Sequence, residues 1–182
     1  MNRFLVILCL LLTAFACKSP EARRPISAKS GSFIDKSVER NIQLNNRERA
    51  AFETIMEKDS LTEYIASNNG FWFYYNTKKV ADSLITPEFG DIVTYNYTIK
   101  DINETIIYNK DELKQQTYIM DKQELFTGLR KGLKLMRTGE TVTFLFPSQK
   151  AYGYYGDENK IGTNVPLICE VSLLNIKTTE PN

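Results

Sequence analysis

The stretch that decides the fold is FTGLRKGLKLMRTGETVTFLF, residues 126–146. Its first apolar residues recur at steps of three, four and three, so they share one face of a short helix: Phe126, Leu129, Leu133 and Met136. Gly128 and Gly132 lie four apart on a neighbouring line of that helix. Each glycine costs ~1 kcal/mol relative to alanine inside a helix. We therefore expect them to allow a close approach between the helix and a sheet.

Segments typical of strands lie on both sides of this helix, and they are residues 71–75, 92–99, 105–108, 117–120, 140–146 and 167–176. Residues 71–75 are five consecutive aromatics, FWFYY. Such a run could serve as a platform for a ligand, but a strand with its inner face in the core is the favoured interpretation. The pattern predicts an α+β domain, in which an antiparallel sheet wraps around a single short helix. We place this domain at residues 70–182.

The N-terminal segment is typical of an export signal. A positive charge at Arg3 precedes an apolar run from Phe4 to Ala16, which at 13 residues is too short to span a bilayer. The alternative, a buried helix of the domain, is disfavoured by the polar segment that follows. Cys17 comes directly after Thr-Ala-Phe-Ala, and this resembles a bacterial lipobox in which Ala14 stands where leucine is usual. We expect a lipoprotein signal peptide over residues 1–16 and a lipidated Cys17 that anchors the chain to a membrane.

Two further segments separate Cys17 from the predicted domain. Residues 17–45 are rich in Pro, Ser, Lys and Arg, which predicts a flexible tether. A solvated linker is favoured over a basic segment that binds an anionic membrane surface. Residues 46–69 carry apolar residues at helical spacing, which predicts an N-terminal helix. Two partners remain open for its apolar face, the domain itself and a second copy of the helix.

Composition excludes several classes of function. The chain has 182 residues, a net charge of +1 and no histidine. Near-neutral charge gives no electrostatic basis for binding nucleic acid. The missing histidine removes Ser-His-Asp and Cys-His catalysis and histidine metal sites, so we predict no metal and no cofactor. An enzyme with this composition would need a reaction with little proton transfer.

Several motifs, taken in order, resemble the FKBP-type peptidyl-prolyl isomerase family over roughly residues 70–177. They are Gly90–Tyr95 (GDIVTY), Phe126–Leu133 (FTGLRKGL), Met136–Glu140 (MRTGE), Phe146–Gly153 (FPSQKAYG) and Ile161–Asn164 (IGTN). The layout of lipobox, tether, helix and divergent domain is most similar to the gliding-motility-associated FKBP-type lipoproteins of Bacteroidetes. The resemblance agrees with the absence of histidine, because rotation about a prolyl bond breaks no bond and needs no acid or base.

The resemblance also implies a set of pocket residues. They are Tyr95, Ile107, Tyr118, Leu125, Phe126, Leu129, Tyr152, Ile161 and Cys169. In this assignment Tyr152 donates its hydroxyl to a substrate carbonyl, and the Ile161 backbone N–H is a second donor. Phe126 and Leu125 line the proline slot, Leu129 forms its floor and Tyr95 forms one wall. Without the resemblance, each would be read as an ordinary core residue.

Three positions depart from the family pattern. Leu129 stands where a floor tryptophan is usual, and Cys169 replaces a phenylalanine of the last strand. The usual Phe-Asp pair aligns with Ile107-Tyr108 after an insertion around residues 102–104, which leaves no carboxylate near the pocket. These departures predict weak isomerase activity and weak macrolide binding.

Two functions follow from the resemblance. The leading one is a lipid-anchored isomerase that helps exported or envelope proteins fold by acting on their Xaa-Pro segments, with gliding-motility machinery among the systems it serves. The alternative is a non-catalytic FKBP-like module that binds a partner in a motility or secretion complex. The expected location is the cell envelope, on the outer membrane and facing the periplasm, because Lys18-Ser19 after the cysteine includes no inner-membrane aspartate.

Overall fold

A computed structural model describes residues 30–80 and 85–179. The predicted signal peptide, Cys17 and the first part of the predicted tether lie outside the described residues. The chain divides into two compact units, Met1–Glu39 and Arg40–Asn182. The first unit contributes only the start of one helix to the described residues, so the fold below is that of the second unit.

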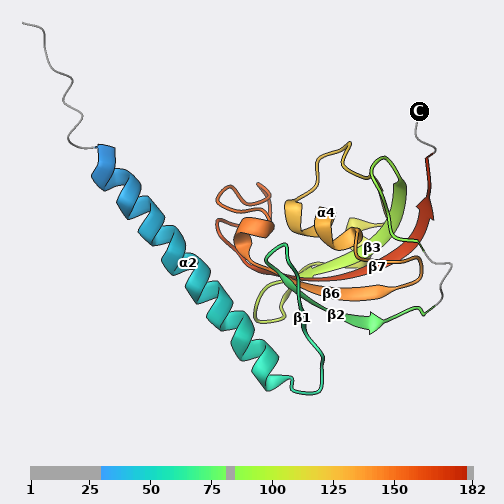
Figure 1. The fold of residues 1–182 in the computed structure, drawn as a ribbon, viewed down its shortest axis with the longest axis horizontal. Coiled ribbons are helices and arrows are strands. Elements are labelled where there is room, and N and C mark those ends of the chain that lie inside the picture. Colours follow the sequence, from blue (N-terminus) through green and yellow to red (C-terminus); the bar gives the residue numbers. More distant parts are fainter. Residues whose placement is uncertain (1–29, 81–84, 180–182) are drawn as a thin grey trace, which may run out of the picture. The chain divides into compact units, whose positions relative to one another are not determined.

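The second unit is built on a seven-stranded antiparallel sheet, with strand order β1-β2-β6-β7-β3-β4 and β5 also paired with β3 (Figure 1). The strands are β1 Ile65–Ala66, β2 Trp72–Thr77, β3 Ile92–Lys100, β4 Ile106–Tyr108, β5 Gln116–Ile119, β6 Thr141–Phe146 and β7 Leu167–Lys177. The helical elements are α2 Ser30–Lys58, α3 Lys110–Leu113, α4 Thr127–Leu133 and the 3₁₀ turn η1 Ser148–Lys150. The α+β prediction of an antiparallel sheet around a short helix is confirmed.

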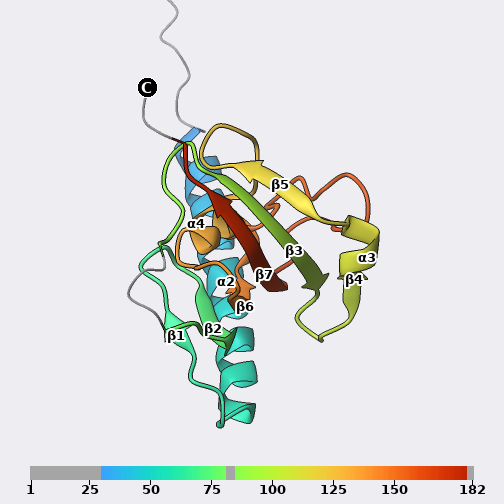
Figure 2. The same ribbon diagram turned by 90° about the vertical axis from the view of Figure 1, so that its right-hand side faces the viewer.

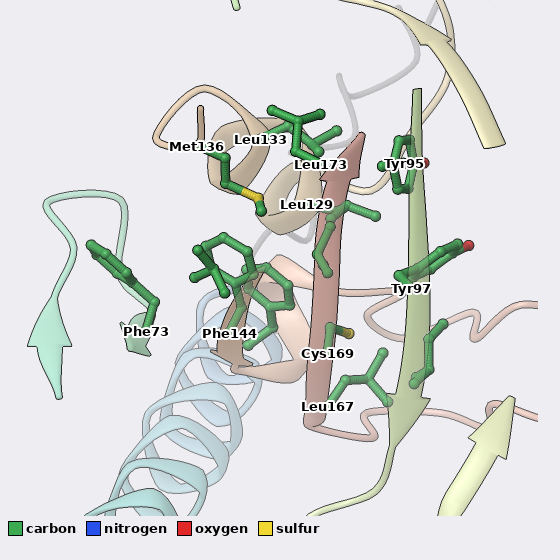
Figure 3. Packing of buried hydrophobic residues seen from close by; sticks show 14 of the residues in the cluster. Phe73, Tyr95, Tyr97, Leu129, Leu133, Met136, Phe144, Leu167, Cys169 and Leu173 are labelled. Atoms are coloured by element: carbon green, nitrogen blue, oxygen red, sulfur yellow. The ribbon is translucent and has the colours of Figure 1, made fainter. Parts of the chain in front are cut away.

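The two faces of the sheet have separate cores. On the α4 face, alternate residues of the long strands are buried, and Figure 3 shows Tyr95 and Tyr97 of β3, Cys169 of β7 and Leu129 of α4 packed together. On the opposite face, Phe52 of α2 packs with Leu145 and Ile168. Because both faces of β6 are covered, five of its six residues are buried.

The helix α4 lies close against the sheet, as its glycines predict. A Cβ atom placed on Gly128 would lie 2.6 Å from a ring carbon of Phe146 and 2.7 Å from the Lys150 carbonyl oxygen. A Cβ on Gly132 would lie 2.9 Å from the ring of Phe144. Real Cβ atoms do not approach other atoms so closely, so glycine is required for this packing.

The aromatic run contributes to both cores, which explains why five aromatics follow one another. Phe71 and Phe73 are buried on the α4 face. Trp72 and Tyr74 pack on the opposite face beside Phe52. The interpretation of residues 71–75 as a core strand is therefore confirmed, with the strand itself beginning at Trp72.

The bounds predicted for the tether and the helix are wrong. The predicted tether continues to residue 45, yet α2 already begins at Ser30 and ends at Lys58. The polar composition of residues 30–45 suggested a tether, but a helix accepts polar residues wherever it faces solvent. At the other end, Ile65 has helical spacing but pairs with Phe73 in the β1–β2 ladder. The pairing with β2 outweighs the local preference for helix.

The expectation of a single helix after residue 70 also needs correction, because α3 and η1 are present. α3 is one turn, capped by Asn109, whose side chain accepts hydrogen bonds from the N–H groups of Asp111 and Glu112. Figure 2 shows α3 beside β4, beyond β3. Within the described residues, no helix is both long enough and apolar enough to cross a bilayer.

Candidate functional site

The nine predicted pocket residues belong to one apolar cluster on the α4 face of the sheet. Five are buried and form its interior: Tyr95, Tyr118, Leu129, Ile161 and Cys169. The other four are partly exposed and pack on them: Ile107, Leu125, Phe126 and Tyr152. They come from β3, β4, β5, α4, β7 and the loops before α4 and β7. Figure 3 shows three of the interior residues, with Leu129 between α4 and β7.

Phe126 and Tyr152 form the partly exposed edge of this cluster. Their ring centroids are 5.0 Å apart, and the Phe126 ring also meets Phe146 edge to face at 5.5 Å. Phe126 is the N-cap residue of α4, with extended backbone. The helix α4 therefore begins directly beside these two rings.

The Tyr152 hydroxyl is suited to donate a hydrogen bond. Burial raises its pKa well above the usual range, and the nearby Tyr97 and Cys169 raise it further. The phenol therefore remains protonated throughout the physiological range. No hydrogen bond occupies this hydroxyl within the described part of the chain.

Three further polar groups of the cluster, those of Tyr95, Tyr97 and Cys169, stay neutral. Burial raises the pKa of the Tyr95 hydroxyl strongly and that of Tyr97 to about 12, and it raises the pKa of the Cys169 thiol as well. These groups carry no charge near pH 7. Cys169 is fully buried and acts as a small apolar residue between β6 and β3.

The role predicted for the Ile161 backbone is not available in this structure. The Ile161 N–H donates to Asp157 Oδ1 at 2.7 Å, so it is already bonded. The Ile161 side chain is buried in the cluster, as expected. The missed partner lies only four residues earlier, and the sequence contains no signal stronger than an aspartate in a turn-rich segment.

Asp157 also corrects the expectation that the site lacks a carboxylate. Its Oδ2 accepts a hydrogen bond of 2.5 Å from the hydroxyl of Tyr108, which occupies the position where the family pattern has aspartate. Burial acts to raise the pKa of Asp157, but the hydrogen bonds from Tyr108 and from the N–H groups of Ile161 and Asn159 outweigh it and hold this pKa below its usual range. The carboxylate thus comes from the loop before β7.

Lys160 completes this polar group at the rim. Its ammonium lies 4.7 Å from the centroid of the Tyr108 ring and pairs with Glu112 of α3. The Lys160 N–H donates to the Tyr108 hydroxyl at 3.3 Å. The loop before β7 is therefore fastened to β4 and α3 through Tyr108 and Glu112.

Two cavities in the described part of the chain lie away from this cluster. One of about 80 Å³ is lined by residues of α2 and of strands on the opposite face, including Ile55, Tyr74 and Ile168. The other, of about 310 Å³, lies among α2, the β1–β2 connection and Pro147. Neither is lined by a predicted pocket residue.

An antiparallel sheet around α4, with an aromatic and aliphatic cluster at the helix N-terminus, defines an FKBP-like domain. Residues 85–174 match the family model described as FKBP-type peptidyl-prolyl cis-trans isomerase. This part of the chain belongs to the FKBP-type peptidyl-prolyl cis-trans isomerase family.

Two relatives resemble the same part of the sequence. The probable FKBP-type peptidyl-prolyl cis-trans isomerase FkpA of Neisseria meningitidis serogroup B is 30% identical over 94 residues, which cover 52% of this chain and 34% of that protein. The peptidyl-prolyl cis-trans isomerase Mip of Coxiella burnetii is 30% identical over 92 residues, or 50% of this chain and 40% of that one. The similarity thus spans well under half the length of these relatives.

Solved structures share the fold. A peptidyl-prolyl cis-trans isomerase from Pseudomonas syringae pv. tomato aligns with a TM-score of 0.59 at 20% identity, over 75% of this chain and 95% of that chain. FkpA from Escherichia coli aligns with a TM-score of 0.60 at 20% identity, over 94% of this chain and 80% of that one. At this identity the likeness supports the fold alone.

Proposed function

We propose that the chain catalyses cis–trans isomerisation of Xaa-Pro bonds in exported or envelope proteins. The observation that carries the proposal is the pair of rings, Phe126 and Tyr152, at the edge of an uncharged cluster, with an unoccupied Tyr152 hydroxyl. Family membership supports the same reaction.

Prolyl isomerisation breaks no covalent bond, so the protein needs to supply neither an acid nor a base. Rotation about a prolyl bond is slow because amide resonance favours the planar form, which is more charge-separated than the twisted form. An apolar surface withdraws water from the planar amide and so favours the twist. Phe126 would bind the proline ring, and Tyr152 would donate to a substrate carbonyl. A thousandfold acceleration requires only ~4 kcal/mol of differential binding.

The direct test is the cis-to-trans rate of short Xaa-Pro peptides with the purified full chain. We expect acceleration, and we expect Tyr152→Phe to lower kcat/KM several-fold while leaving the unfolding midpoint unchanged, because it removes a donor and keeps the ring. Tyr154→Phe is the matched control, since Tyr154 is 70% exposed. Equal activity of wild type and Tyr152→Phe would remove Tyr152 from the mechanism.

A non-catalytic binding module is the second candidate. Leu129 at the floor, Tyr108 in place of an acid and the bonded Ile161 N–H favour it. A folded chain that accelerates none of a series of peptides with different residues before proline would decide for this candidate.

The envelope location belongs to the same proposal and rests on the sequence around Cys17. Cys17→Ser is expected to leave isomerase activity intact and to move the chain out of the membrane fraction. Retention of the variant in membranes would contradict the lipid anchor. Service to gliding-motility machinery is the narrowest part of the proposal, and unchanged surface spreading of cells without the chain would contradict it.

A further inference from the structure

Glu48 of α2 is buried, with only 4% of its surface exposed. Its Oε2 accepts a hydrogen bond of 2.9 Å from the N–H of Ser148, which begins η1. Its Oε1 and the Ser148 Oγ are both buried without a hydrogen-bond partner in the described part of the chain. One bond to a backbone N–H returns less free energy than burial of a carboxylate costs. Stability alone therefore does not account for a glutamate at this position.

The bond from Glu48 reaches the segment that carries Tyr152. The Ser148 carbonyl accepts hydrogen bonds from Ala151 N–H at 3.0 Å and from Gly153 N–H at 2.9 Å. These two amides flank Tyr152 on either side. A single residue, Ser148, thus donates its N–H to Glu48 of α2 and accepts with its carbonyl from the amides before and after Tyr152.

Other contacts, all through backbone carbonyls, hold the same segment. The Pro147 carbonyl accepts hydrogen bonds from Lys150 N–H at 2.8 Å and from Ala151 N–H at 3.2 Å. The Lys150 carbonyl packs against Gly128 of α4, and the Gly153 carbonyl accepts from Asn164 N–H at 2.8 Å. Among the side chains of the described residues, Glu48 is the one whose hydrogen bond reaches this turn, and it comes from the face of the sheet opposite the pocket.

We propose that Glu48 is a positioning residue for Tyr152. It touches no substrate, and it sets the direction of the Tyr152 side chain by fixing the backbone at Ser148. The expected effect on kcat/KM rests on the proposed isomerase function. The expected effect on the backbone around Tyr152 does not. Through Glu48, α2 then helps to position a residue of the proposed active site.

Two substitutions separate positioning from general support. Glu48→Leu keeps the volume but removes the acceptor, whereas Glu48→Gln keeps an oxygen that can accept from Ser148 N–H. Glu53→Ala is the matched control on the same helix, because Glu53 is exposed and pairs only with Arg49 in the described structure. Glu48→Ala replaces the leucine variant if leucine prevents folding.

The measurements are amide hydrogen exchange at Ala151 and Gly153, the unfolding midpoint, and kcat/KM on an Xaa-Pro peptide, all with the full chain. In Glu48→Leu we expect exchange at these two amides to rise about tenfold relative to amides of β7. We expect kcat/KM to fall about threefold or more, a loss larger than any change in the midpoint explains. Glu48→Gln should restore both values, and Glu53→Ala should change neither.

Unchanged exchange at Ala151 and Gly153 in Glu48→Leu would overturn the proposal. A rise shared equally by the β7 amides would also overturn it, because it would indicate general loosening. If the wild-type chain shows no isomerase activity, the proposed function fails, while the exchange data still decide whether Glu48 holds the segment around Tyr152.

Discussion

At the scale of single residues, the cluster around Tyr108 shows how one substitution is accommodated by another part of the chain. Tyr108 replaces an acidic residue of the family pattern, and its hydroxyl reaches Asp157 in the loop before β7. The same carboxylate accepts the N–H of Ile161, so one side chain fastens the loop to β4 and removes a backbone donor from the site. A carboxylate is therefore still present near the site, but both of its oxygens are hydrogen-bonded to Tyr108 and to the backbone of the loop before β7.

Asp157 gives the domain a defined sensitivity to acid. Its folded-state pKa lies below the unfolded value of ~3.9, so its contribution to stability is present at neutral pH and is lost as pH falls through the folded pKa. Asp157→Asn should therefore be less stable than wild type at pH 7, and the gap should close as the pH falls below ~4. Thermal unfolding from pH 7 to pH 2.5 measures both. A gap that stays constant with pH would contradict this assignment.

Site residues differ in how far sequence could predict them. Tyr95, Leu129, Phe126 and Tyr152 could be assigned to one site through the family resemblance, whereas their residue types alone predicted only that they belong to the core. The bonds of Asp157 depend on the path of a loop between residues 153 and 167, which no periodic pattern describes. The burial of Glu48 could not be predicted for a different reason, since a glutamate in a polar helix is normally expected to be solvent-exposed.

At the scale of elements, the contact between α4 and β6 is set by backbone proximity. Gly128 lies against Phe146 and the Lys150 carbonyl, and one of these neighbours is backbone that cannot rotate away. The pair of glycines is thus the part of the sequence that encoded the fold most directly. The end of α2 was harder to predict from the sequence, because Ile65 fits the helical spacing but belongs to β1.

Gly128→Ala tests this packing. Alanine gains ~1 kcal/mol in helix propensity, but its Cβ would overlap Phe146 and Lys150, so we expect a net loss of about 1–3 kcal/mol. Gly162→Ala is the control, because a Cβ at Gly162 has no atom within 4 Å. Chemical denaturation of both variants measures the difference. Equal stability of Gly128→Ala and wild type would mean that the helix and sheet separate at little cost.

At the scale of the whole molecule, the domain boundary lies inside α2 and not after it. Residues 40–182 form one compact unit, and Phe52 covers Leu145 and Ile168 on the second face of the sheet. The sequence suggested a boundary at residue 70, because the aromatic run begins there and the family resemblance begins nearby. The family model matches residues 85–174 and so does not include the helix that covers the second face of the sheet.

A chain of residues 70–182 should consequently be less stable than one of residues 40–182. Removing α2 and β1 exposes Trp72, Leu145 and Ile168, and the loss of Phe52 from its cluster alone is worth about 3 kcal/mol or more. Denaturation midpoints of the two chains give the comparison. If they agree, the second core adds nothing to the stability of the fold.

The place of β7 in the sheet has a consequence for how the molecule is made. β7 pairs with β6 on one side and β3 on the other, yet it is the last strand in chain order. During synthesis, β3 and β6 therefore each lack one pairing strand until Leu167–Lys177 has left the ribosome. A polypeptide that cannot close its sheet early stays unfolded for longer, and that delay is compatible with the export proposed above.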